Sequence, residues 1–170
     1  MIERPVSSEY EAYYHQYVSK VPQGDVLELM ETRMRDTASL LAGIGADKAG
    51  YRYAPGKWSI KQVVGHLVDV ERLFGYRAMA FARNDKTRLP SFEQNEYVEH
   101  ADFDNRPLSD IAGEFECIRR STVALFRSFD PDVLMRTGVA SGFSFTVGSV
   151  AFIIAGHEIH HMGVLQERYL

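Results

Sequence analysis

Three of the six histidines lie within five residues near the end of the chain, in the segment GHEIHHMGVLQERYL. An α-helix advances about 100° per residue, so residues four positions apart share a face. His157 and His161 are therefore expected one turn apart on the apolar stripe of a helix, whereas His160 lies roughly 60° from His157 and outside that stripe. Two imidazoles at this spacing can bind one transition-metal ion.

A metal site needs a further ligand from another element, and His66 in the segment KQVVGHLVDVERLF is the candidate. It lies at the edge of the apolar stripe of its own expected helix, from which it can reach a neighbouring helix. Glu71 lies roughly 140° from His66 on that helix and is not expected to hold the same ion. Asp69 is expected either to accept a ring N–H of a ligand or to be a solvated carboxylate.

Three neutral imidazoles leave at least one coordination position open, which is typical of a catalytic rather than a structural site. An ion held there can lower the pKa of water, polarise a carbonyl or bind a thiolate. The ligands suit a divalent transition metal, namely Zn, Ni, Co or Fe(II), without choosing among them. The catalytic residues stay unassigned, because Glu158 points roughly 100° away from His157 and no other general base stands out.

Other residues that could carry chemistry have simpler interpretations. The paired imidazoles could instead be hydrogen-bonded core residues. His15 and His100 are expected to be structural or exposed. Ser59 is explained as a helix cap, and Cys117 as a buried, inert thiol. Arg168 shares the arc of the paired histidines and could either meet an anionic substrate or offset the helix dipole.

Length and composition place the chain among ordinary globular proteins. Its 170 residues, 45% hydrophobic and 25% charged, suit a single domain spanning residues 1–170. The net charge of −4 and the lack of a Lys or Arg run argue against a nucleic-acid partner. A single cysteine, no apolar leader and no stretch long enough to span a bilayer indicate a cytoplasmic protein without a membrane partner.

Helix signals dominate the sequence. Capping patterns and apolar spacing predict a short helix opened by Ser8 and Glu11, and four long helices over about 25–43, 59–83, 107–129 and 146–170. Asp25 and Ser59 are the expected caps of the first two, and either Thr146 or Ser144 caps the last. Residues 84–106 form a long connection, and such connections are often functional. No alternation persists long enough to predict a sheet. We therefore expect an all-α four-helix bundle with a short extra N-terminal helix and a long loop between its second and third helices.

Two segments carry a resemblance to a known family. YRYAPGKWSIKQVVGHLVDVER (51–72) and the closing GHEIHHMGVLQERYL resemble the DinB-like superfamily of YfiT-type four-helix metal-binding proteins, and the likeness covers nearly the whole chain. In that family, one histidine follows the Trp-Ser motif and two lie on the last helix, and together they hold a divalent metal. The matching positions are His66, His157 and His161.

The resemblance also implies a range of activities. Relatives include thiol-dependent transferases and isomerases, and proteins described as metal-dependent hydrolases, and many of them are homodimers. We therefore expect a homodimeric metal-dependent hydrolase or thiol-dependent transferase that acts on a small-molecule substrate, with a low-molecular-weight thiol as a partner. The alternative is a non-enzymatic, dimeric, stress-associated module in which the metal is structural.

Overall fold

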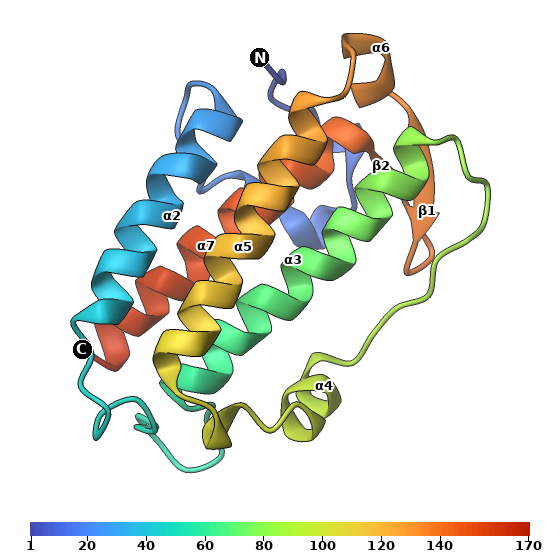
Figure 1. The fold of residues 1–170 in the computed structure, drawn as a ribbon. Coiled ribbons are helices and arrows are strands. Elements are labelled where there is room, and N and C mark those ends of the chain that lie inside the picture. The colour runs from blue at the N-terminus through green and yellow to red at the C-terminus, as the bar shows by residue number, and fades with distance from the viewer.

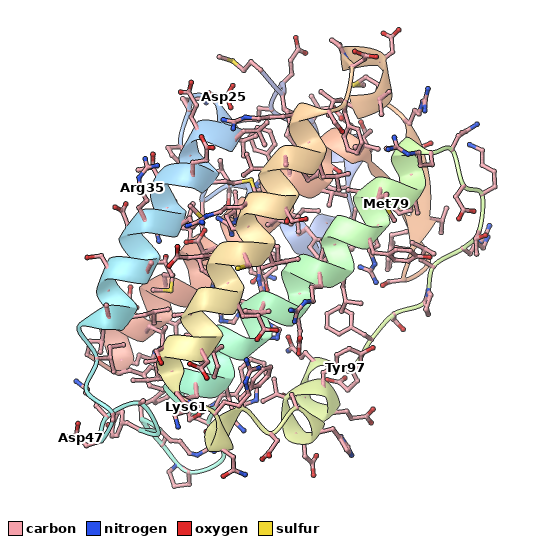
Figure 2. The ribbon with its side chains drawn as sticks, viewed as in Figure 1. Asp25, Arg35, Asp47, Lys61, Met79 and Tyr97 are labelled. Atoms are coloured by element: carbon pink, nitrogen blue, oxygen red, sulfur yellow. The ribbon has the colours of Figure 1, made fainter.

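Four long helices lie side by side in the computed structural model, which describes all residues 1–170 (Figure 1). They are α2 (Val26–Ala42), α3 (Ile60–Ala82), α5 (Leu108–Arg127) and α7 (Val147–Arg168). Charged side chains such as Arg35 of α2 point outward from this bundle (Figure 2). The predicted four-helix bundle is confirmed. No helix combines the length and the apolar character needed to cross a membrane.

Shorter elements surround the bundle. Two 3₁₀ turns and a one-turn helix precede it, a short helix and a 3₁₀ turn lie in the long connection, and a short helix and a hairpin precede the last helix. In chain order they are η1 (Ser7–Glu9), η2 (Ala12–Tyr14), α1 (His15–Val18), α4 (Gln94–His100), η3 (Phe103–Asn105), α6 (Pro131–Leu134), β1 (Thr137–Ala140) and β2 (Phe143–Thr146).

The long helices begin where the capping residues predicted. The Asp25 carboxylate accepts the backbone N–H groups of residues 27 and 28 at the start of α2. Ser59 and Gln62 form the reciprocal capping box of α3, and the Thr146 hydroxyl accepts the N–H of Ser149 at the start of α7. These side chains satisfy donors that have no partner within the helix, and so they fix its first turn.

The N-terminal segment differs from the prediction. Ser8 and Glu11 do not form a capping box. The Glu11 carboxylate instead accepts the N–H of Tyr13 and starts a new 3₁₀ turn, while Glu9 accepts the N–H of Val6. Local side-chain hydrogen bonds thus compete with a continuous helix here, and only the single turn α1 is α-helical.

The prediction that the chain forms no sheet was wrong at one place. Strands β1 and β2 form an antiparallel hairpin in which Thr137 pairs with Thr146 and Ala140 with Phe143. Ser141 and Gly142 connect them with φ angles of 54° and 86°, as a two-residue turn requires. Four residues per strand are too few for alternation to show in the sequence.

Two apolar clusters fill the bundle, and a buried polar network lies where they meet. A small cavity bounded by Leu67 of one cluster and Ile154 of the other is also lined by charged side chains of the network. We call this the four-helix network, because each bundle helix contributes one residue: Thr37, Glu71, Arg119 and Glu158.

Arg119 is the centre of this network and is 1% exposed. Its Nε and Nη2 donate to the two carboxylate oxygens of Glu71, each at 2.8 Å. Its Nη1 donates to Glu158 at 2.6 Å, and the Thr37 hydroxyl donates to the other oxygen of Glu158 at 2.7 Å. Burial opposes the charge of Arg119, but the two carboxylates outweigh it and raise the pKa of the guanidinium.

Removing the charge of Arg119 is predicted to destabilise the bundle strongly. Arg119→Met leaves the buried Glu71 without a cation and Glu158 with only the more distant Arg33, at 3.8 Å. It should lower the free energy of unfolding by about 3–5 kcal/mol. Arg120→Met, a control at the adjacent, exposed ion pair with Glu116, should cost less than about 1 kcal/mol. Urea denaturation measures both values, and equal costs would contradict the role given to the network.

Candidate metal site

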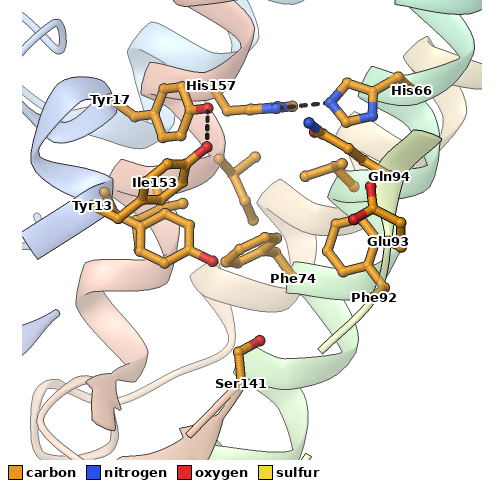
Figure 3. A pocket seen from close by; sticks show the side chains of 13 residues that line it. Tyr13, Tyr17, His66, Phe74, Phe92, Glu93, Gln94, Ser141, Ile153 and His157 are labelled. Atoms are coloured by element: carbon orange, nitrogen blue, oxygen red, sulfur yellow. Dashed lines mark hydrogen bonds between the residues drawn. The ribbon is translucent and has the colours of Figure 1, made fainter. Parts of the chain in front are cut away.

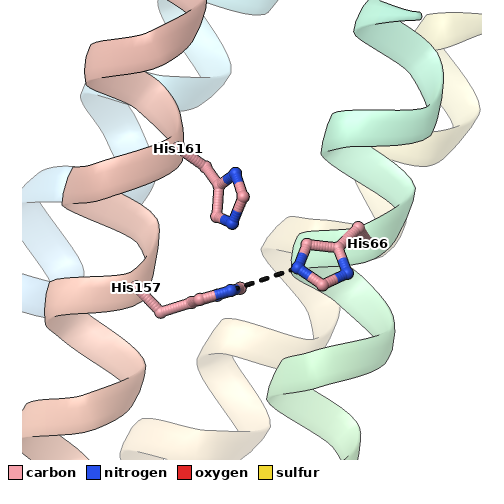
Figure 4. A group of neighbouring side chains, drawn as sticks. All are labelled: His66, His157 and His161. Atoms are coloured by element: carbon pink, nitrogen blue, oxygen red, sulfur yellow. Dashed lines mark hydrogen bonds between the residues drawn. The ribbon is translucent and has the colours of Figure 1, made fainter. Parts of the chain in front are cut away.

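His66 of α3 and the pair His157 and His161 of α7 point toward one another across the bundle (Figure 4). One ring nitrogen from each lies within 4.8 Å of the other two, and the Nε2 atoms of His66 and His157 are 3.1 Å apart. The structure therefore brings together the three histidines that the sequence singled out. Their role as metal ligands stays a prediction.

The distances and donor types fit a transition metal. Two nitrogens that bind one tetrahedral zinc at 2.0–2.1 Å lie roughly 3.3 Å apart, close to the separation of His66 and His157. The third nitrogen, on His161, lies within 4.8 Å of both. No carboxylate belongs to the group. Imidazole donors alone suit Zn, Ni or Fe better than Mg or Ca, which prefer oxygen ligands.

Burial keeps these imidazoles neutral. It lowers the pKa of His66 from 6.5 to about 4. Burial, together with the neighbouring His66 and His160, lowers the pKa of His161 to about 3. The pKa of His157 falls well below its usual value, first through burial and then through the neighbouring histidines. At neutral pH all three therefore offer the unprotonated nitrogen that a metal requires.

A glycine precedes two of the three histidines, and each lets another element pack closely. A Cβ at Gly65 would lie 2.5 Å from the Phe103 ring, and a Cβ at Gly156 would lie 2.1 Å from the carbonyl oxygen of Tyr17. Helix α1 thus rests directly on the backbone of α7. The Tyr17 ring meets the His157 ring edge-on, with centroids 5.2 Å apart.

The remaining histidines lie away from this group. His15 is bonded through Nδ1 to the Tyr10 hydroxyl at 3.0 Å, and the exposed His100 is bonded to the Glu96 carbonyl of its own helix. His160 is half-buried beside Tyr17, with ring centroids 5.5 Å apart, and is not one of the three converging residues. This agrees with the helical spacing, which placed His160 outside the stripe that holds His157 and His161.

Other candidate residues have different surroundings from those expected. The Asp69 carboxylate lies 3.7 Å from Arg72 and contacts no histidine. Arg168 is exposed, and its guanidinium lies over the Tyr53 ring. The prediction that Cys117 is buried was wrong, because Cys117 is exposed. It lies two positions before the buried Arg119, roughly 200° around the helix, and hence on the outer face of α5.

Two cavities border the histidines. The first, of about 220 Å³, is lined by His66 and His157 at one end and by Ser141 at the other (Figure 3). The second, of about 270 Å³, is lined by His160 and His161 together with Tyr53, Trp58 and Tyr169. Gln94 of α4 lines the first cavity, and the next residue, Asn95, lines the second. The start of α4 therefore lies between them.

Sequence reasoning missed most of the cavity wall. Three tyrosines of the N-terminal segment and the loop residues before α4 line the first cavity: Tyr13, Tyr14, Tyr17, Phe92, Glu93 and Gln94. Two signals were available. The clustered N-terminal tyrosines could either line a pocket or pack in the core, and the unusual length of the connection at 84–106 indicated a functional loop without naming its residues.

Comparison with known proteins supports the family resemblance. A sequence model of the DinB superfamily matches residues 28–165. YfiT from Bacillus subtilis, described as "a probable metal-dependent hydrolase with an unusual four-helix bundle topology", is 17% identical, with a TM-score of 0.70 over 96% of this chain and 89% of that one. A mycothiol-dependent maleylpyruvate isomerase is 13% identical, with a TM-score of 0.68 over 85% of this chain and 61% of that one. No curated protein matched the sequence.

Adding a methyl group at Gly156 is predicted to disturb the packing of α1 over His157. Gly156→Ala should lower the free energy of unfolding by about 1–3 kcal/mol, because α1 must move away from the new Cβ. Gly163→Ala is a matched control on the same helix, since nothing lies within 4 Å of that Cβ. It should leave stability unchanged or raise it by up to ~1 kcal/mol. Urea denaturation that gives the same shift for both variants would refute the close approach.

The burial of His66 predicts how the metal-free protein responds to acid. The pKa of His66 is about 4 when folded and 6.5 in its ordinary state. Between these values the unfolded chain binds the additional proton, so stability should fall as the pH is lowered through this range, by roughly 3 kcal/mol. The measurement is urea denaturation of chelator-treated protein at a series of pH values.

Two variants isolate the contribution of His66. His66→Asn removes this titration, so its loss of stability between pH 6.5 and about 4 should be shallower than that of the wild type. His100→Asn alters an exposed histidine and should keep the wild-type slope. Parallel curves for the wild type and His66→Asn would show that burial does not depress this pKa.

Proposed function

This chain belongs to the DinB superfamily, and on that premise we propose that it is a metal-dependent enzyme acting on a small molecule. His66, His157 and His161 hold a divalent transition metal. The observation that carries the proposal is the convergence of three neutral imidazoles, of which the buried His66 and His157 line one end of the first cavity and the half-buried His161 lines the second. A purely structural ion does not need a cavity beside it, whereas a reacting molecule does.

The chain's own residues define what the site can do. The three imidazoles supply three ligands and leave the directions facing the cavities open to another molecule. A divalent cation bound there supplies Lewis-acid chemistry, polarising a substrate oxygen or stabilising a thiolate. Tyr17 covers His157 from the N-terminal side and keeps water from that face.

The two cavities favour a reaction between two molecules. His66 and His157 border the first cavity and His161 borders the second, so two reactants can approach the same centre from different sides. The isomerase of similar fold is mycothiol-dependent, and YfiT is described as "a probable metal-dependent hydrolase". We favour transfer or isomerisation with a low-molecular-weight thiol as the second molecule. Hydrolysis, with water in the second cavity, is the other candidate.

Metal binding is tested by removing one ligand at a time. The wild type should bind one Zn²⁺, Ni²⁺ or Fe²⁺ per chain, measured by elemental analysis and calorimetry. His66→Ala, His157→Ala and His161→Ala should each weaken binding by at least about 100-fold, because two imidazoles hold an ion poorly. His100→Ala, outside the site, should bind as the wild type does. A ligand variant that keeps full stoichiometry and affinity would remove that histidine from the site.

A spectroscopic measurement distinguishes a structural ion from a catalytic ion with an open coordination position. In protein loaded with Co²⁺, adding 2-mercaptoethanol should change the visible absorption spectrum, because a thiolate enters an open position. A closed, structural site would keep its spectrum while still raising the melting temperature when the metal binds.

A further inference from the structure

The protein buries two arginines almost completely, and only one has a counter-charge. Arg119 is bonded to two carboxylates, whereas Arg77, which is 3% exposed, forms no ion pair. The Arg77 Nη2 donates to the Pro90 carbonyl at 2.9 Å and to the Ser141 hydroxyl at 3.2 Å, and its buried Nη1 has no partner. A buried, uncompensated cation is costly, so its position calls for an explanation.

Arg77 lies on the same face of α3 as His66. It follows His66 by eleven residues, which is about three helical turns. Val70 and Phe74 lie between them on that face, and both line the first cavity. The Arg77 guanidinium lies 4.9 Å from the centre of the Phe74 ring, so its side chain leans back toward His66, as long side chains on helices do.

Two hydroxyl groups separate the guanidinium from the cavity. An arginine can only donate hydrogen bonds, so Ser141 accepts from Arg77 and keeps its own proton free to donate. Tyr14 is the other polar neighbour: burial raises the pKa of its hydroxyl, and the charge of Arg77 partly offsets this. Both Tyr14 and Ser141 line the cavity, and neither donates to another protein group. We call Tyr14, Ser141 and Arg77 the anion end of the cavity.

The backbone holds Ser141 in this position. Its φ of 54° places it in the left-handed region, where glycine, asparagine and aspartate are the usual residues of a two-residue hairpin turn. The Ser141 N–H donates to the Leu89 carbonyl at 3.0 Å. The hairpin tip is therefore tied to α3 through its side chain and to the long connection through its backbone.

The two ends of the cavity differ in charge, with a carboxylate near one end and the Arg77 guanidinium behind the other. Glu93 is its only acidic lining residue and lies on the side of His66 and Gln94, whereas Ser141 lies at the far end (Figure 3). Glu93 is exposed and accepts the N–H of Asn95 at 3.1 Å. Apolar side chains fill the wall between the two ends. An organic anion bound with its charge at the anion end thus avoids the carboxylate and lays its apolar part along this wall.

We propose that the substrate is a small organic acid whose carboxylate binds at the anion end while its reacting group faces His66 and His157. The hydroxyls of Tyr14 and Ser141 donate to the carboxylate, and Arg77 supplies the opposing charge behind them. The cavity is smaller than the ~300–1,000 Å³ typical of sites for drug-sized ligands, which restricts the acid to a compact molecule. The direction of the reacting group rests on the proposed function, whereas the anion end can be tested without metal.

The test compares 3-phenylpropionate with its uncharged amide on metal-free protein, so that the metal cannot attract the carboxylate. Dissociation constants come from NMR titration. The acid should bind the wild type at least about tenfold more tightly than the amide, since hydrogen bonds to a charged group are the stronger ones. Arg77→Met should bind both with similar affinity. Arg83→Met, an exposed position at the end of the same helix, should keep the full preference for the acid.

Two further measurements keep the outcomes separate. Circular dichroism checks folding, and if Arg77→Met does not fold, Tyr14→Phe decides, because it removes only a hydroxyl and should reduce the preference severalfold. Equal binding of acid and amide by the wild type, or no binding of the acid at millimolar concentration, overturns the proposal. So does a preference that survives in the folded variants. The absence of a metal site would not change this result, because acid and amide binding are measured on metal-free protein. Metal content is measured separately and should be normal in Arg77→Met.

Discussion

The four-helix network is the interaction on which the rest of the structure depends. Salt bridges and hydrogen bonds in water contribute little, but inside a low-dielectric core they must be satisfied almost completely. Arg119 can satisfy its donors only when α3 presents Glu71 and α7 presents Glu158 at the same level. The network therefore fixes both the rotation and the axial position of these two helices. An apolar core would tolerate small shifts that a network of directed bonds does not.

The position of the three histidines depends on this alignment. Glu158 follows His157 directly, and Glu71 lies five residues after His66 on α3. The pairing of Arg119 with both carboxylates thus sets the separation of the helices close to the histidines themselves. Catalytic and metal-binding groups need to be held within a fraction of an ångström. Here the hydrogen bonds of Arg119 to Glu71 and Glu158 hold α3 and α7 in place beside the three histidines.

Local sequence patterns predicted the bundle but not its polar centre. The caps at Asp25, Ser59 and Thr146 and the facing of His157 and His161 follow from contacts within one helix, so the sequence displays them. Nothing in the sequence around Arg119 marks its role, because its partners lie 39 and 48 positions away. Periodicity carries no information about such distant pairing.

The same limit applies to the parts that enclose the cavity. A glycine within a helical pattern indicates weakness in the helix, and only the approach of Tyr17 explains Gly156. The hairpin is two short strands whose pairing with Leu89 of the long connection is a tertiary contact. The converging histidines were therefore accessible from the sequence, while the shape of the space beside them was not.

The residues around the cavity differ in how freely they can be substituted. The histidines stand on bundle helices whose alignment is fixed by buried charges, so substitutions there endanger folding itself. Ser141, by contrast, belongs to a turn at the edge of the bundle, and the residues before α4 belong to a surface connection. Such segments accept change readily. Substitutions in these segments can therefore change which molecules the cavity accepts without disturbing the buried helices that carry the histidines.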